Sequence, residues 1–197
     1  MSKVSKKTAA ALPAINMLRS GVQMLDPDSS DLEVRIAIVA ARFNGVIVDR
    51  LIEGAIAALN KAGVASNGIT LVRVPGAWEL PVVAGALAET LVFDGIVALG
   101  CVIRGETAHF DVIANESARG LMQVALDHSV PVANGVLACE TEHQALDRAG
   151  GGAHGNKGTE AAQALLDTLG VMAAIDTSFG GLATELDDLD LDEDMFR

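Results

Sequence analysis

The strongest constraint on the fold is an alternation of apolar runs of strand length with segments of helical periodicity. The runs lie at 34–41, 69–75, 95–103 and 130–139, and the helical segments at 46–62, 78–90, 109–128, 141–149 and 156–174. The runs are continuously apolar, which is typical of parallel strands buried on both faces. This order predicts one α/β domain with a parallel sheet between two layers of helices.

Local signals support these boundaries. Gly63 follows the first helical segment, where glycine commonly ends a helix, and Pro81 falls in the first turn of the second, where proline is tolerated. Four strands in this order predict a three-layer, flavodoxin-like fold, in which a parallel four-stranded sheet has helices on both faces. In such sheets ligands bind outside the carboxyl ends of the strands, so the turns after the strands are the expected place for a site.

The two ends of the chain depart from this pattern. Residues 1–33 have no sustained periodicity and are expected to form a flexible extension. Residues 179–197 hold seven acidic residues and one arginine, which predicts a solvated acidic tail. The folded domain is therefore expected at 34–178.

Composition narrows the partners and the compartment. A net charge of −12 argues against nucleic acid, which needs a basic face, but it leaves room for small anions held by one or two local cations. No apolar run reaches the roughly 20 residues of a membrane helix. Cys101 and Cys139 fit no metal or redox spacing, and the N-terminus does not resemble a signal peptide, so reduced thiols and a cytoplasmic location are expected.

Aromatic residues are scarce in this chain, with five Phe, one Trp and no Tyr, so those that follow strands stand out. Phe43 comes after the first strand and either packs under the next helix or stacks on a planar ligand. Trp78 comes after the second strand, next to Gly76, which permits close approach of a ligand to the backbone. Glu79 in the same turn either interacts with the helix dipole or accepts hydrogen bonds from a ligand.

The segment after the third strand, GCVIRGETAHF (100–110), is the most informative. Backbone N–H groups at the start of the following helix, with the Thr107 hydroxyl, can cradle an anion, although the P-loop pattern is absent. His109 lies in the first helical turn. It is either a surface or capping residue, or a group that accepts and donates protons near neutral pH.

Arg148 and Lys157 flank a glycine-rich run after the fourth strand. They either bring two cations to an anion, for which arginine offers bidentate contacts, or Arg148 only occupies the favourable end of a helix dipole. The sequence lacks GxSxG, GxGxxG and any metal-ligand spacing. These features together favour chemistry on a phosphorylated small molecule and a flat ring.

Five motifs in this order resemble the lumazine synthase family of riboflavin biosynthesis: ARFN (41–44), VPGAWELP (74–81), GCVIRGETAHFD (100–111), GVLACETEHQALDRAG (135–150) and GNKG (155–158). The resemblance covers about 34–175. It implies condensation of 5-amino-6-(D-ribitylamino)uracil with 3,4-dihydroxy-2-butanone 4-phosphate to 6,7-dimethyl-8-ribityllumazine, releasing phosphate and water, without a cofactor. It also implies homopentamers, or larger assemblies built from pentamers, with active sites between neighbouring subunits.

The resemblance assigns roles to the residues within its motifs. It implies that His109 is the proton donor and acceptor. It implies that the pyrimidine substrate is bound by Phe43, Ala77, Trp78, Glu79, Cys101, Val102 and Ile103. The phosphate would be held by the backbone amides of Glu106 and Thr107 and by Arg148, with Lys157 a weaker candidate. Asn134 stands where many members carry an aromatic residue, on the wall of the pyrimidine pocket that a neighbouring subunit supplies.

Two other functions compete with this reading. A non-enzymatic homologue that holds riboflavin or lumazine, or assembles a shell, is suggested by Asn134 and the acidic tail. The joint presence of Glu79, His109 and Arg148 argues against it. A flavin electron carrier on the same fold lacks the Ser/Thr-rich first loop expected around a flavin phosphate.

Overall fold

The four apolar runs form one parallel sheet in the computed structural model, which describes Leu25 and residues 33–180. The strands are β1 (Ile36–Ala41), β2 (Ile69–Val74), β3 (Gly95–Ile103) and β4 (Val132–Cys139). Their order across the sheet is β2-β1-β3-β4, and every neighbouring pair is parallel. The central strands are the most apolar because helices cover them on both sides: all of β1 and the first seven residues of β3 are buried.

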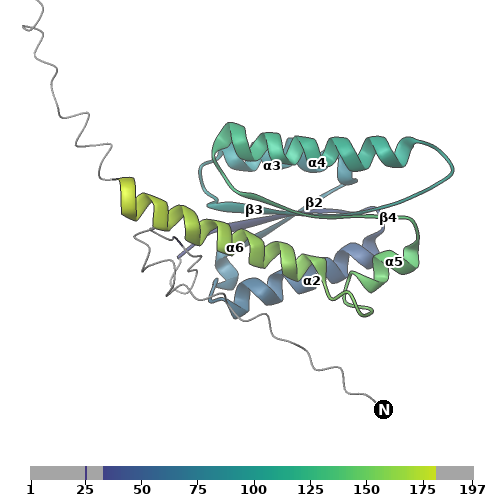
Figure 1. Cartoon of the computed structure of the whole chain (residues 1–197), viewed down its shortest axis with the longest axis horizontal. Coiled ribbons are helices and arrows are strands. Elements are labelled where there is room, and N and C mark those ends of the chain that lie inside the picture. The colour runs from purple at the N-terminus through teal and green to yellow at the C-terminus, as the bar shows by residue number, and fades with distance from the viewer. Residues whose placement is uncertain (1–24, 26–32, 181–197) are drawn as a thin grey trace, which may run out of the picture.

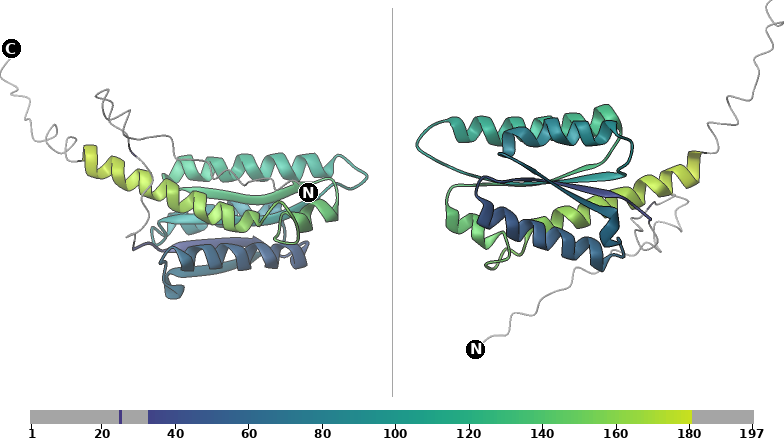
Figure 2. Two further views of the ribbon diagram at one scale, coloured as in Figure 1. Left: turned by 60° about the horizontal axis from the view of Figure 1, so that its bottom comes forward. Right: turned by 180° about the vertical axis from the view of Figure 1, so that it is seen from behind.

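Two layers of helices cover the sheet (Figure 1). One layer holds α3 (Leu80–Glu89) and α4 (His109–His128), and the other holds α2 (Gly45–Lys61), α5 (Glu142–Asp147) and α6 (Lys157–Ile175). The two further views in Figure 2 show the same division. Short helical turns lie at Ser66–Gly68, Ala77–Glu79 and Asp176–Gly180. The predicted three-layer α/β fold is confirmed.

The core between these layers is aliphatic. Its largest fully buried side chains are all leucine, isoleucine or valine. Phe110 is the one aromatic residue among the buried core side chains of the described chain, whereas Phe43 is 70% exposed and Trp78 is 53% exposed. The rings that follow β1 and β2 are therefore not needed for packing and are free to contact a ligand.

The observed elements begin and end within two residues of the predicted ones. Gly63 follows α2 in a left-handed conformation, with φ of 94°, as the helix-stop signal requires. The helix predicted at 78–90 starts at Leu80 because residues Ala77–Glu79 form a 3₁₀ turn first. No helix in the described ranges is long and apolar enough to cross a membrane. The predicted extension at 1–33 and tail at 179–197 lie, but for Leu25, Glu33, Phe179 and Gly180, outside the described residues.

Candidate functional site

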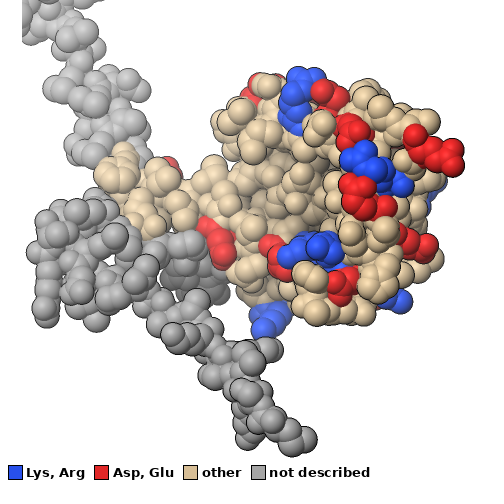
Figure 3. Space-filling view, turned by 45° about the vertical axis from the view of Figure 1, so that its right-hand side comes forward, with Lys and Arg blue, Asp and Glu red and all other residues tan. Residues whose placement is uncertain are grey.

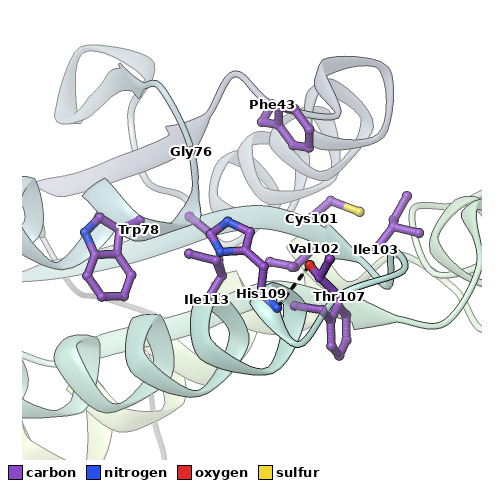
Figure 4. A pocket seen from close by; sticks show the side chains of 12 residues that line it. Phe43, Gly76, Trp78, Cys101, Val102, Ile103, Thr107, His109 and Ile113 are labelled. Carbon is purple, nitrogen blue, oxygen red and sulfur yellow. Dashed lines mark hydrogen bonds between the residues drawn. The ribbon is translucent and has the colours of Figure 1, made fainter.

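A cleft with a volume of about 360 Å³ opens at the carboxyl ends of β1, β2 and β3 (Figure 4). This is the place where ligands bind in open parallel sheets. The cleft is lined by Phe43, Gly76, Ala77, Trp78, Cys101, Val102, Ile103, Gly105, Thr107, His109, Phe110 and Ile113. Eight of the residues predicted from the sequence are therefore brought together here: Phe43, Ala77, Trp78, Cys101, Val102, Ile103, Thr107 and His109.

Backbone contacts hold Phe43 at the mouth of the cleft. Its N–H donates to the Pro75 carbonyl oxygen at 3.0 Å, which extends the β1–β2 pairing beyond the strands. The next residue, Asn44, has a left-handed φ of 54°, and its side-chain Nδ2 donates to the Cys101 carbonyl oxygen at 2.9 Å. The Phe43 ring is 70% exposed, so it does not pack under α2. Of the two predicted alternatives, a face available for stacking fits the structure.

The turn after β2 presents Trp78 through a local hydrogen bond. The Gly76 N–H donates to Glu79 Oε2 at 2.8 Å, which is the carboxylate half of a capping box and spans the Ala77–Glu79 turn. Glu79 therefore stabilises the turn that carries Trp78, and it is not among the residues that line the cleft. A contact between Glu79 and a ligand stays a prediction.

The loop after β3 places His109 and an array of backbone donors beside the rings. The His109 N–H donates to Thr107 Oγ1 at 3.4 Å, just before the start of α4 (Figure 4). Among the described residues, no protein acceptor takes the N–H groups of Glu106 and Thr107. Both residues are exposed, and the Glu106 side chain does not line the cleft. Free amides at a helix start are suited to an anion.

The floor of the cleft is apolar. It consists of Cys101, Val102 and Ile103 from the last part of β3. Burial, with a smaller contribution from the nearby Cys139, raises the pKa of the Cys101 thiol to about 12. Cys101 is therefore protonated at neutral pH and does not act as a nucleophile, because the reactive form is the thiolate.

A second hollow, of about 470 Å³, lies along the edge strand β4 and contains three of the other predicted residues. Asn134, Arg148 and Lys157 line it, together with Glu160 and apolar side chains. The Lys157 N–H donates to the Arg148 carbonyl oxygen at 2.8 Å, so the glycine-rich loop returns on itself and brings the two cations together. No residue lines both the hollow and the cleft. One chain thus holds the predicted site in two separate parts.

Arg148 differs from four other basic residues of the described chain. Arg73, Arg104, Arg119 and Lys157 each form an ion pair with a carboxylate. On the face drawn in Figure 3, most Lys and Arg side chains likewise lie beside Asp or Glu. Arg148 Nη1 instead donates to the Gln144 carbonyl oxygen at 3.0 Å, and no carboxylate within the described ranges pairs with it. Its positive charge is available to an anion.

The sequence reasoning missed Ile113, which lines the cleft one helical turn after His109. The spacing of four residues on a predicted helix was the available signal, because such residues share a face. Among the residues that the structure describes, no three His, Cys, Asp or Glu side chains are grouped closely enough to hold a metal ion.

The fold and the cleft define an α/β enzyme that binds small molecules at the carboxyl edge of a parallel sheet. A family model described as 6,7-dimethyl-8-ribityllumazine synthase matches residues 33–173. The 6,7-dimethyl-8-ribityllumazine synthase of Desulfovibrio desulfuricans (strain ATCC 27774 / DSM 6949 / MB) is 50% identical over 139 residues, which are 71% of this chain and 88% of that protein. That of Nitratidesulfovibrio vulgaris (strain DP4) is 51% identical over 139 residues, with the same coverage.

The chain belongs to the 6,7-dimethyl-8-ribityllumazine synthase family. It is a transferase of riboflavin biosynthesis that acts on small molecules, and its reaction is the condensation that yields 6,7-dimethyl-8-ribityllumazine. The resemblance stated from the sequence is confirmed, and the family replaces the scaffold and flavin-carrier alternatives.

Proposed function

We propose that the cleft is the pyrimidine half of the active site and that His109 moves the protons of the condensation. The observation that carries this proposal is that two exposed rings, an apolar floor, an imidazole and unpaired backbone amides meet in the cleft. Phe43 and Trp78 stack on or border the pyrimidine ring, and Ala77, Val102 and Ile103 contact its edges. The Glu79 carboxylate keeps its cap on Gly76 and reaches the ribityl chain with its second oxygen.

The phosphate of the butanone substrate is held at the start of α4 in this proposal. The amides of Glu106 and Thr107 point their hydrogens toward the anion, while the exposed Glu106 carboxylate stays in solvent. The primary amine of the uracil attacks the ketone carbon and forms an imine with loss of water. Phosphate then leaves by elimination, and the ribityl-bearing nitrogen attacks the carbonyl that results and closes the ring with loss of a second water. His109 accepts and returns protons during these steps. Holding both substrates at one edge contributes several kcal/mol, because orientation lowers the entropic barrier.

We further propose that a neighbouring subunit supplies the second half of each site in a homopentamer or a pentamer-based assembly. Arg148 would neutralise the departing phosphate, with Lys157 beside it, and Asn134 would face the pyrimidine. Support comes from the separation of cleft and hollow within one chain and from the position of the hollow along the edge strand β4. A head-to-tail contact that places this edge over the next subunit's cleft closes into a ring.

Mixed assemblies test both proposals. His109→Ala impairs the cleft half and Arg148→Ala impairs the edge half, so each variant alone should form little lumazine at a concentration of the phosphate substrate below its wild-type KM. After dissociation and joint reassembly in equal amounts, about one quarter of the sites should combine an intact cleft with an intact edge, because adjacent subunits are paired at random. Recovered lumazine absorbance supports a shared site. Activity no higher than that of the separate variants would place both halves in one chain.

Two remaining expectations are also proposals. A folded domain at 34–178 is supported by the family match over 33–173, and it predicts that the isolated 34–178 fragment folds and assembles. A cytoplasmic location rests on the spacing of the two cysteines, which are free. Cell fractionation tests that location.

A further inference from the structure

Arg104 lies in the chain between the strand that forms the floor of the cleft and the loop of free amides, but its side chain does not line the cleft. It follows Ile103, the last residue of β3, and precedes Gly105. Its side chain is 36% exposed, and all three guanidinium nitrogens donate to carboxylates. Nη1 and Nη2 donate to the two carboxylate oxygens of Asp111 at 3.0 and 2.9 Å, and Nε donates to the carboxylate of Glu140 at 2.8 and 3.0 Å.

These contacts join segments that are distant in the sequence. Asp111 is in the first turn of α4, two residues beyond His109, whereas Glu140 directly follows β4. Phe110, between His109 and Asp111, lies under the guanidinium, with 4.1 Å from Cζ to the ring centroid. The Arg104 backbone N–H also donates to the Cys139 carbonyl oxygen at 2.9 Å. The Arg104 side chain thus connects the start of α4 to the residue that follows β4.

The loop that this arginine spans has few other restraints. Between Gly105 and Ala108, within the described chain, the Thr107 hydroxyl contact to His109 is the one side-chain hydrogen bond, and the N–H groups of 105–107 have no protein acceptor. Because these amides have no protein acceptor, backbone hydrogen bonds do not hold the loop in place. The Asp111 and Glu140 pairs therefore restrain its far end, at the helix start, from outside the cleft.

The electrostatics favour a permanent restraint. The Arg104 guanidinium lowers the pKa of the Asp111 carboxyl, chiefly through their hydrogen bonds, and the two carboxylates raise the pKa of Arg104. Arg104 and Asp111 therefore both stay charged at neutral pH. Lysine cannot replace this arrangement, because a single ammonium lacks the planar fork that serves two carboxylates at once.

We propose that Arg104 is a positioning residue for the condensation, which holds the 105–109 segment so that the His109 imidazole and the Glu106 and Thr107 amides face the cleft. This inference rests on the proposed roles of His109 and of those amides. Exposed ion pairs add little to stability, so the effect lies in geometry, to which the rates of oriented reactions are very sensitive.

The test compares Arg104→Gln with a matched control, Arg119→Gln, in the full-length assembled enzyme. Arg119 is on the surface of α4. Like Arg104 it pairs with a carboxylate, that of Glu116, but it does not line the cleft. We expect Arg104→Gln to lower kcat roughly 10- to 100-fold, while the KM for the pyrimidine changes less than about twofold. Arg119→Gln should match the wild type in both constants.

Partner variants separate the restraint from general stability. Asp111→Asn breaks the contact to α4 with little change in shape and should reproduce most of the kcat loss. The Arg104→Gln/Asp111→Asn double variant should lose little more, because coupled residues are not additive. Arg104→Lys should stay well below wild-type kcat. Thermal midpoints of all variants should lie within about 4 °C of the wild type, since the pairs are exposed.

Three results would overturn the inference: wild-type kcat in Arg104→Gln, full rescue by Arg104→Lys, or a kcat loss that merely follows a fall in folded protein. His109→Ala is measured in the same assay. If it turns over like the wild type, the proposed role of His109 is wrong whatever Arg104 does. If His109→Ala is slow and Arg104→Gln is not, only the positioning role fails.

Discussion

The cleft and the β4-edge hollow differ in the chemistry they offer. The cleft is built of rings, aliphatic side chains and an imidazole, and in the described structure no Lys or Arg lines it. The hollow lies beside the edge strand β4, and Arg148, Lys157 and Glu160 line it from the segments that follow this strand. No described aromatic residue lines it. A flat, uncharged ring suits the first surface and an anion suits the second. Neither surface alone is equipped for a reaction that joins a pyrimidine to a phosphorylated ketone.

The two surfaces also differ in how the chain constructs them. The cleft depends on short-range turns, such as the Gly76–Glu79 cap, placed side by side by the parallel sheet. The hollow depends on a loop that returns on itself, where Ala149 and Asn156 form an isolated bridge and Asn156 caps α6. Substitutions on the two sides should therefore alter different kinetic constants.

The largest expected effect is on the cleft side. His109→Ala should lower kcat by about two to four orders of magnitude, the usual contribution of general acid–base catalysis, with both KM values nearly unchanged. Residual activity should remain because the substrates are still oriented. Steady-state lumazine formation measures this, and His128→Ala, in the last turn of the same helix, is the control. An unchanged kcat would remove the proton-transfer role from His109.

Arg148→Ala should have the next largest effect. We expect the KM for the phosphate substrate to rise roughly 10- to 100-fold, because a charge-assisted, bidentate contact is lost, and the KM for the pyrimidine to change far less. The KM of Arg148→Lys for the phosphate substrate should lie between those of the wild type and Arg148→Ala, since lysine keeps the charge but lacks the planar guanidinium. Arg119→Ala serves as the control. Equal increases in both KM values would contradict a division of labour between cleft and hollow.

The sequence predicts the cleft better than the hollow for a physical reason. Phe43, Trp78 and His109 each follow a strand, and parallel strands end at a common edge, so periodicity alone places them together. The hydrogen bond between Glu79 and Gly76 was not predicted, because glycine has no side chain that would complete a capping-box pattern. The position of Glu79 predicted instead an interaction with the helix dipole or with a ligand.

Contacts between residues distant in the sequence could not be predicted from hydrophobic periodicity. Glu140 is 36 residues from Arg104, and their meeting depends on the register in which Ile103 pairs with Cys139. Likewise, Lys157 reaches Arg148 because the glycine-rich loop turns back, with Gly150 and Gly155 at positive φ. Residue types alone indicated two cations near an anion. They did not indicate that these cations lie on the sheet edge, away from the histidine.

The smallest expected effect concerns the ring that the hollow lacks. Asn134 is exposed on β4, and its Oδ1 accepts a hydrogen bond from the Val136 N–H at 3.0 Å, so its side chain is bound to the strand and offers no aromatic ring for stacking. If this edge covers the pyrimidine bound by the next subunit, Asn134→Phe should lower the KM for the pyrimidine roughly two- to tenfold, the range of one aromatic pair.

Asn134→Leu is the matched control for this prediction. It loses the same hydrogen bond to Val136 and adds apolar volume without a ring, so it isolates stacking from burial. The KM for the phosphate substrate should not respond to either change, because Arg148 is untouched. A lower pyrimidine KM with Phe but not with Leu would place the β4 edge over the ring. Equal KM values in both variants and the wild type would mean that Asn134 does not face the pyrimidine, and the division between cleft and hollow would then rest on Arg148 alone.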